Sequence, residues 1–187
     1  MQVIEGPLPG LKIIEPKVFG DDRGFFLESF NLNRYEEALG QKLNFVQDNQ
    51  SFSQKGVLRG LHIQNPKAQG KLVSVVHGEV FDVAVDVREG SPTFGKWYGV
   101  YLSGENKKQF WIPKGFAHGF MVTSDTALFT YKCDDYYSPE SEFSIRWDDP
   151  SIGIKWPEGI NPQLSPKDLD ASLLSNIPKE KLVEFKG

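Results

Sequence analysis

The stretch Val80-Phe81-Asp82-Val83-Ala84-Val85-Asp86-Val87 gives the clearest indication of how this chain folds. Successive side chains of a β-strand point to opposite faces. In this stretch Phe81 and three valines share one face, while Asp82, Ala84 and Asp86 share the other. The pattern predicts a strand whose apolar face packs against a core.

Similar short strands are predicted along most of the chain. The residues from 72 to 76 are expected to form the preceding strand, with His77-Gly78 as the turn between the two. Further strands are expected at 11–18, 25–30, 45–52, 57–63, 98–102, 109–112, 118–123, 128–133 and 143–147. Many short strands separated by Gly and Pro turns predict an all-β sandwich or barrel.

Helical signals are few. One helix is expected from Asn33 to Leu39, with Asn33 as its cap. A second is expected near the C-terminus, beginning at Ser165 with Pro166 in its first turn and with Leu169, Leu173 and Leu174 at helical spacing. The Pro-rich stretch 150–166 is expected to be a loop that wraps the same domain.

Length and composition limit the classes of protein to consider. A chain of 187 residues predicts one domain, at 1–187. The net charge of −4 argues against general affinity for nucleic acid or membranes, which requires a basic face. The single cysteine, Cys133, is expected to be a small buried apolar group. Without a long apolar segment or a signal-peptide pattern, we expect a cytoplasmic protein.

The chain has only three histidines, at 62, 77 and 118. Metal-binding cupins, which are small jelly rolls, typically carry an H-x-H pair, but the residue two positions after His62 is Gln64. With one cysteine and no H-x-H pair, we expect no catalytic metal.

The segment from Gly56 to Gln64 is the main candidate for chemistry. Arg59 and His62 are three positions apart and cannot share a strand face unless the backbone kinks, which Gly60 would allow. The plainer alternative is a surface arginine and a core histidine.

Five other positions are also candidates. Gln47 and Asn49 alternate along a strand, so they line either a ligand-binding interior or an exposed face. Lys71 begins a strong strand, where a buried ammonium would need an anionic partner. Tyr131 reads locally as a packed aromatic residue, and Asp168 reads locally as a carboxylate that returns a bond to the helix cap.

Eight blocks of sequence, taken together and in order, resemble the dTDP-4-dehydrorhamnose 3,5-epimerase family. Two of them are Val57-Leu58-Arg59-Gly60-Leu61-His62 and Gly115-Phe116-Ala117-His118-Gly119-Phe120. The full set occupies residues 16–26, 46–49, 57–62, 68–73, 78–86, 111–113, 115–120 and 164–168. One block alone is a weak match, whereas eight in the same order are highly specific.

The resemblance implies a homodimeric, cupin-type jelly roll that needs neither metal nor organic cofactor. It implies that His62 is the general base, Tyr131 the general acid and Asp168 the partner that orients His62, with Lys71 near the sugar's C4 oxygen. The implied contacts to nucleotide or sugar are Arg23, Glu28, Gln47, Asp48, Asn49, Arg59, Lys71, His118, Glu142 and Lys167. Candidates for stacking on thymine are Phe26, Tyr136 and Tyr137, and the segment around Arg23 is expected to serve the partner subunit's site.

The implied reaction inverts C3 and C5 of dTDP-4-dehydro-6-deoxy-D-glucose, giving dTDP-4-dehydro-L-rhamnose. Both hydrogens lie next to the C4 ketone, so removing either one places negative charge on the C4 oxygen. Inversion needs a base on one face of the sugar and a proton donor on the other. The alternatives are an epimerase that inverts one carbon only, a non-catalytic module that binds nucleotide sugars, and a metal-dependent cupin.

Overall fold

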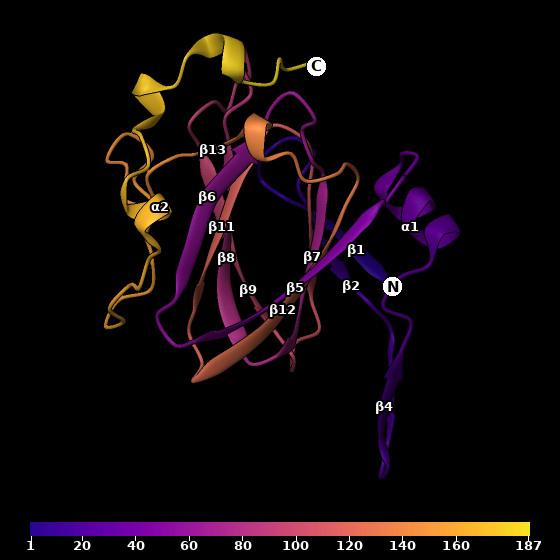
Figure 1. Ribbon diagram of the computed structural model, residues 1–187. Helices are drawn as coiled ribbons and strands as arrows, with labels where there is room; N and C mark the ends of the chain where they lie inside the picture. Colours follow the sequence, from indigo (N-terminus) through magenta and orange to yellow (C-terminus); the bar gives the residue numbers. More distant parts are fainter.

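Two antiparallel sheets that face each other form the body of the protein, in a computed structural model that describes residues 1–187 (Figure 1). The six-stranded sheet has the order β1-β2-β10-β7-β12-β5, and the five-stranded sheet has the order β13-β6-β11-β8-β9. The strands are β1 Gln2–Glu5, β2 Lys12–Glu15, β5 Gln47–Gln54, β6 Leu58–Gln64, β7 Lys71–His77, β8 Glu79–Asp86, β9 Trp97–Ser103, β10 Gln109–Ile112, β11 Phe116–Val122, β12 Thr126–Cys133 and β13 Glu142–Ser144. This arrangement confirms the predicted all-β jelly-roll sandwich.

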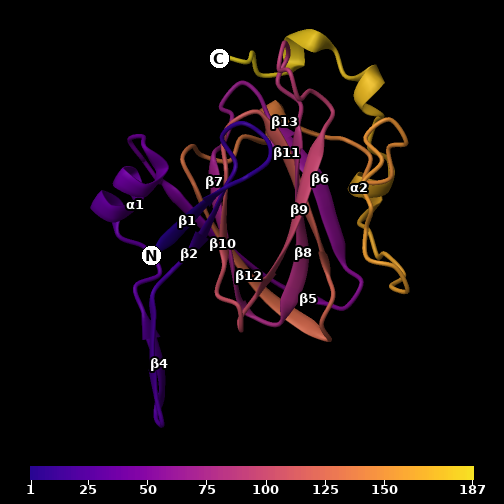
Figure 2. The same ribbon diagram turned by 180° about the vertical axis from the view of Figure 1, so that it is seen from behind.

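Strand β8 is the strand predicted first, but its apolar face does not point into the sandwich. Its two faces are both buried, because a second layer covers the outer one. Phe81 and its three valines pack outside the sheet, against Ile145, Ile152, Leu174 and Leu182 of the C-terminal third of the chain. Figure 2 shows this C-terminal third, in orange and yellow, running beside the sheet. The stretch 150–166 therefore wraps the domain as predicted.

The space between the sheets is filled from both sides by apolar residues. Its largest side chains include Phe110 on β10, Phe120 on β11 and Phe129 on β12. The rings of Phe120 and Phe129 stack with centroids 4.2 Å apart and join the two sheets. Asp82 and Ala84 of β8 also face this interior, so the polar face of the first predicted strand points inward.

Two short helices lie outside the sandwich. Helix α1, Leu32–Leu39, is capped by Asn31, whose side chain accepts a hydrogen bond from the amide of Arg34, so the predicted cap at Asn33 was wrong. Helix α2, Pro166–Leu169, is a single turn capped by Ser165, as predicted. Its predicted apolar face was wrong, because Leu169 is 58% exposed and the chain leaves the helix there. The 3-10 turns are Pro139–Ser141, Leu174–Asn176 and Lys179–Lys181, and no helix has the length and apolar character needed to span a bilayer.

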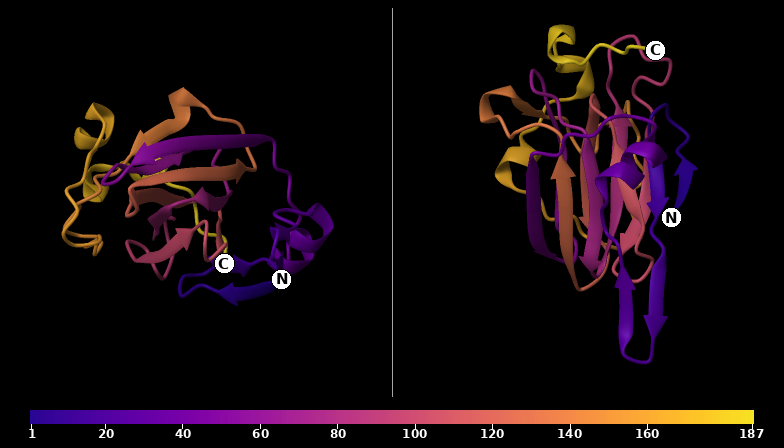
Figure 3. Two further views of the ribbon diagram at one scale, coloured as in Figure 1. Left: turned by 90° about the horizontal axis from the view of Figure 1, so that it is seen from below. Right: turned by 90° about the vertical axis from the view of Figure 1, so that its right-hand side faces the viewer.

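A hairpin near the N-terminus stands away from both sheets (Figure 3). It consists of β3, Val18–Asp21, and β4, Gly24–Leu27. The predicted strand at 25–30 therefore ends early. Phe19 and Phe26 face each other across the two strands and are 53% and 69% exposed. The hairpin thus presents aromatic side chains to its surroundings.

Candidate active site

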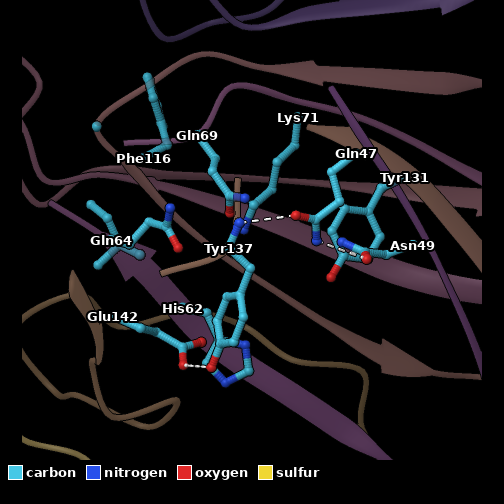
Figure 4. A pocket seen from close by; sticks show the side chains of 12 residues that line it. Gln47, Asn49, His62, Gln64, Gln69, Lys71, Phe116, Tyr131, Tyr137 and Glu142 are labelled. Carbon is cyan, nitrogen blue, oxygen red and sulfur yellow. Dashed lines mark hydrogen bonds between the residues drawn. The ribbon is translucent and has the colours of Figure 1, made fainter. Parts of the chain in front are cut away.

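A pocket of about 290 Å³ lies between the two sheets. The six-stranded sheet contributes side chains from β5, β7 and β12, and the five-stranded sheet contributes them from β6, β11 and β13. The lining residues are Gln47, Asn49, His62, Ile63, Gln64, Gln69, Lys71, Gly115, Phe116, Tyr131, Tyr137 and Glu142. Figure 4 shows these side chains gathered around the pocket.

His62 reaches this pocket because β6 is irregular just before it. The register between β6 and β11 shifts between His118 and Phe120, opposite Gly60. Gly60 has φ +130°, and a Cβ there would lie 2.6 Å from the Cα of Gly119, so a side chain cannot be accommodated. The kink that Gly60 allows is therefore present, and Arg59 and His62 line one common cavity beside α2.

Asp168 on α2 meets His62 directly. Its Oδ1 lies 2.7 Å from Nε2 of His62, and its Oδ2 accepts a hydrogen bond from the amide of Gly60 at 3.2 Å. Burial favours a higher pKa for Asp168, but the bonds from His62 and Gly60 outweigh it and lower the pKa below its usual value. The expectation that this carboxylate returns a bond to the helix cap was wrong; Ser165 Oγ instead accepts from the Asp168 amide.

An ionised Asp168 fixes the protonation of the His62 ring. A carboxylate accepts hydrogen bonds, so Nε2 of His62 carries the hydrogen that it donates to Asp168. The other ring nitrogen, Nδ1, makes no hydrogen bond within the protein and, in neutral imidazole, holds a free lone pair. His62 is thus neither a satisfied core histidine nor a surface one, with its side chain 29% exposed. It can accept a proton from a ligand in the pocket.

The opposite sheet places Lys71 and Tyr131 across from His62. They lie on the paired strands β7 and β12, and the Lys71 Nζ is 5.9 Å from the centre of the Tyr131 ring. Burial lowers the pKa of Lys71, while the negative charge of Glu142 acts in the opposite direction. Burial raises the pKa of Tyr131, so its hydroxyl stays protonated at neutral pH. This wall offers a cation and a neutral proton donor.

Strand β5 forms the polar side of the same wall. Gln47 and Asn49 face the pocket, and the side chain of Gln47 donates to Asn49 Oδ1 at 3.0 Å. The alternate residues of β5, which are Asp48, Gln50, Phe52 and Gln54, are exposed, as the predicted alternation requires. Asp48 is one of those, and it pairs with Lys132 at 3.1 Å instead of lining the pocket. Cys133 is buried, as predicted, and burial raises the pKa of its thiol to about 11.

The rim of the pocket carries three linked polar side chains. The carboxylate of Glu142 accepts from the Tyr137 hydroxyl at 2.9 Å and from Lys167 Nζ at 2.6 Å. Burial opposes ionisation of Glu142, but the bond from Lys167 prevails and lowers its pKa. Tyr137 is 51% exposed and lines the pocket, whereas Tyr136, 62% exposed, does not. On position alone, Tyr137 is the better of these two platforms for an aromatic ligand.

Arg59 is held at the edge of the cavity beside α2. Its Nε and Nη2 both donate to Ser53 Oγ, at 3.2 and 3.0 Å. Both are neutral contacts, so the guanidinium keeps its charge free for an anion. Arg59, Lys71 and Lys167 therefore surround the site with positive charge, although the chain has a net charge of −4.

Besides Asp48 and Tyr136, four of the predicted site residues line neither this pocket nor the cavity beside α2. His118 is 6% exposed, bonds Asp82 Oδ2 at 2.9 Å and does not line the pocket, so its contact with a ligand stays a prediction. Burial lowers the pKa of His118. Arg23 pairs with Asp21 on the hairpin, Phe26 projects from the same hairpin, and Glu28 pairs with Arg34. Arg23, Phe26 and Glu28 therefore do not line the pocket of their own chain.

Several lining residues did not figure among the predicted site residues. Gln64 is two positions after His62 on β6, so strand alternation alone places both on one side. Phe116 belongs to the 115–120 block, but only His118 was singled out there. Gln69 donates to the backbone of Asp135 and belongs to the 68–73 block, but only Lys71 was singled out there. Asp82, which holds His118, is signalled by its position in an otherwise apolar strand.

In sequence and in fold, this chain is similar to proteins of one family. A sequence model of the dTDP-4-dehydrorhamnose 3,5-epimerase family matches residues 5–176. The Shigella flexneri protein named dTDP-4-dehydrorhamnose 3,5-epimerase is 63% identical over 171 residues, covering 91% of this chain and 94% of its own. The crystal structure of the Legionella pneumophila dTDP-6-deoxy-D-glucose-3,5-epimerase, in complex with dTDP-4-keto-L-rhamnose, has a TM-score of 0.97 and 64% identity, covering 100% of this chain and 99% of that chain.

A related enzyme with a different outcome shares the fold. The 3'-monoepimerase of Streptomyces bikiniensis, in complex with dTDP-quinovose, has a TM-score of 0.86 and 36% identity, covering 90% of this chain and 86% of that chain. The fold alone therefore does not separate single from double inversion. The family match over most of the chain and the high identity to named relatives are decisive for membership: the chain belongs to the dTDP-4-dehydrorhamnose 3,5-epimerase family.

Proposed function

We propose that this protein converts dTDP-4-dehydro-6-deoxy-D-glucose to dTDP-4-dehydro-L-rhamnose by inverting C3 and C5. The observation that carries the proposal is the His62–Asp168 pair at 2.7 Å on one side of a pocket, with Lys71 and Tyr131 on the other. Family membership supports the nature of the substrate.

The roles follow from the positions of the groups. Nδ1 of His62 takes the proton from C3 or C5, and the electron pair of the broken C–H bond moves onto the C4 oxygen. The imidazolium that forms is stabilised by the Asp168 carboxylate. Lys71 stabilises the oxyanion, and Tyr131 delivers a proton to the carbon from the opposite side. After each inversion His62 releases its proton to solvent and Tyr131 regains one, which restores both groups. Proton removal and return then balance without a redox partner, and we propose that the reaction needs no metal or organic cofactor.

The nucleotide part of the substrate would occupy the charged rim. Arg59 and Lys167 supply positive charge for the diphosphate, and a guanidinium offers the paired N–H groups that phosphate oxygens accept. Tyr137, fixed by Glu142 at 2.9 Å, supplies a ring for thymine. Gln47 and Asn49 offer hydrogen bonds to the sugar.

We also propose that the protein works as a homodimer. The hairpin of β3 and β4 exposes Phe19 and Phe26, and a groove beside it is lined by Phe25 and Val76, the latter 59% exposed. Contiguous exposed apolar side chains of this kind are typical of protein interfaces. In this arrangement Arg23 and Phe26, which do not reach their own pocket, would serve the site of the second copy.

Solvent exchange is the direct test of the reaction. The wild-type protein is incubated with substrate in heavy water, and NMR follows deuterium at C3 and C5 together with inversion at each carbon. We expect both positions to exchange and invert. Exchange at one carbon only would establish a single-carbon epimerase, the alternative favoured by the likeness to the 3'-monoepimerase. No exchange at either carbon would establish a binding module.

A pair of histidine variants completes the test. We expect His62→Ala to abolish exchange while its affinity for dTDP, measured by calorimetry, stays within about 3-fold of wild type. His77→Ala is the matched control, because His77 is exposed at the far end of β7 and lines no part of the pocket. Dialysis against a chelator, with activity assayed before and after, tests the proposal that no metal is needed.

A further inference from the structure

The C-terminal segment, residues 177–187, lies beyond the range that matches the family. It is nevertheless fastened to the body of the protein. The amide of Glu89 donates to the carbonyl of Val183 at 2.9 Å, and the amide of Phe185 donates to the carbonyl of Glu89 at 2.9 Å. Asn65, which directly follows β6, donates to the carbonyl of Leu182 at 3.3 Å. The segment thus has a fixed course at the end of the sandwich seen at the top of Figure 2.

Arg88 connects this segment to the pocket. Its guanidinium carbon lies 4.5 Å from the ring centre of Phe116, which lines the pocket, and 4.8 Å from that of Phe185. The guanidinium is thus in contact with a ring of the pocket wall and a ring of the C-terminal segment. Contacts between a guanidinium and aromatic faces are favourable, more so when water is excluded, and Arg88 is only 9% exposed.

Arg88 itself cannot move freely. Its Nε and Nη2 donate to the two carboxylate oxygens of Asp86, at 2.9 and 2.7 Å, and Nη2 also donates to the carbonyl of Pro9. Asp86 is fully buried and accepts further hydrogen bonds from Ser91 and Thr93. Because two parallel hydrogen bonds pair the Arg88 guanidinium with a carboxylate, its plane is fixed. The rings of Phe116 and Phe185 pack against this fixed plane.

Gly115, the other pocket-lining residue of this wall, touches the same group. It has φ +90°, and a Cβ built there would lie 2.4 Å from Cγ of Arg88 and 3.2 Å from Cβ of Val183. The backbone of the pocket wall therefore packs directly against Arg88 and the C-terminal segment. A shift of either would be transmitted to Gly115 and Phe116, because packed interiors contain little free space.

We propose that Arg88 and Phe185 form a brace that positions the Gly115-Phe116 wall and thereby fits the pocket to its sugar nucleotide. Neither residue lines the pocket, so both are positioning residues. The inference rests on the proposed function for the identity of the substrate. His62, Asp168, Lys71 and Tyr131 are held by other elements, so loosening the wall weakens substrate binding more than the chemical step.

Kinetics of Phe185→Ala test the brace. We expect KM for dTDP-4-dehydro-6-deoxy-D-glucose to rise about 3- to 10-fold, with kcat within about 2-fold of wild type and an unchanged pH profile. Phe185→Trp keeps an aromatic face over Arg88, and we expect it to restore KM. Lys186→Ala, an exposed neighbour in the same segment, is the matched control and should behave as wild type.

Separate outcomes bear on the brace and on the proposed function. A folded Phe185→Ala protein with wild-type KM, or one that loses thermal stability and kcat but not affinity, overturns the brace. If Phe185→Ala does not yield folded protein, Phe185→Leu makes the same comparison, since it keeps apolar bulk without an aromatic face. If the wild-type protein shows no turnover, the proposed function is wrong and the brace has to be tested by binding alone. The dissociation constant for dTDP is then measured for wild type and Phe185→Ala, and the brace requires it to rise about 3- to 10-fold in the variant.

Discussion

His62 and Asp168 are 106 positions apart in sequence, yet Nε2 of the imidazole lies 2.7 Å from Oδ1 of the carboxylate. The pair forms because one turn of helix, α2, is laid against the kink at Gly60. The same carboxylate also accepts the amide of Gly60, so it holds both the ring and the strand that carries it. Asp168 thereby leaves Nδ1 of His62 as the only ring nitrogen able to take a proton from the substrate.

Asp168→Asn is expected to lower kcat on the order of 100- to 10,000-fold. The amide keeps the shape of the carboxylate but cannot stabilise an imidazolium, and it can present an N–H that selects the wrong ring tautomer. Substrate affinity should change little, because Asp168 does not line the pocket between the sheets. Steady-state kinetics measure the effect. The control is Asp170→Asn, because Asp170 is an exposed carboxylate at the end of the same helix. Equal kcat values for Asp168→Asn and Asp170→Asn would contradict the assignment of Asp168 as the partner of His62.

The stability of the protein should fall in acid partly through the same residue. The pKa of Asp168 is lowered in the folded state, so the folded protein binds this proton less readily than the unfolded chain. Its contribution is therefore fully present above the pKa of an unfolded aspartate, about 3.9, and is lost as the pH falls through the lower folded pKa. We expect the Tm difference between wild type and Asp168→Asn to shrink below about pH 4. A difference that is the same at pH 5 and pH 3 would argue against this linkage.

Tyr131→Phe separates proton removal from proton return. The ring keeps its packing beside Phe129, at 5.7 Å, but the hydroxyl is lost. We expect inverted product to form about 100-fold more slowly or worse, while deuterium still enters the sugar with retention through His62. NMR in heavy water reads both rates. Tyr98→Phe is the matched control, because Tyr98 packs against the same core and does not line the pocket. If Tyr131→Phe lost exchange and inversion to the same extent, Tyr131 would not be the general acid.

Lys71→Met should remove the charge that faces the oxyanion. A donor at such a position is typically worth on the order of 100- to 1000-fold in rate, so kcat should fall by that amount. Burial lowers the pKa of Lys71. Wild-type activity should therefore decline as the pH rises through a value below the ordinary lysine pKa of about 10.4. Lys114→Met, at an exposed lysine that pairs with Asp134, serves as control; a wild-type rate in Lys71→Met would refute the role.

The sequence anticipates the parts of this site that depend on local backbone rules. Alternation places Gln47 and Asn49 on one face of β5, and Gly60 marks the one place where a kink could bring Arg59 and His62 to a common cavity. Both rules operate between close neighbours in the chain. The resemblance to the family supplied the pairing of His62 with Asp168, which local rules had read as a helix-capping contact.

Long-range packing explains the errors. The sequence did not show which face of β8 points into the sandwich: a C-terminal layer covers the apolar face, and the inner face carries Asp82. That aspartate pairs with His118 and holds it behind the pocket lining. The course of residues 177–187 over Arg88 has no periodic pattern that would signal it, because its contacts are with single side chains from distant strands. Such contacts become visible only when the fold is known.

The exposed hairpin yields the last prediction. Phe19 and Phe26 lie opposite each other on its two strands, so Phe19→Ser with Phe26→Ser removes one aromatic face at little cost to the hairpin backbone. If this face joins two copies, sedimentation velocity should show a shift from dimer to monomer for the double variant, and Phe94→Ser, 40% exposed elsewhere, should leave the dimer intact. Phe26→Ser alone, assayed where it remains dimeric, should raise KM if Phe26 serves the second copy's nucleotide site. If the wild-type protein sediments as a monomer at all concentrations, the proposed homodimer is wrong. If dimeric Phe26→Ser has an unchanged KM, Phe26 contributes to the interface but not to the nucleotide site of the second copy.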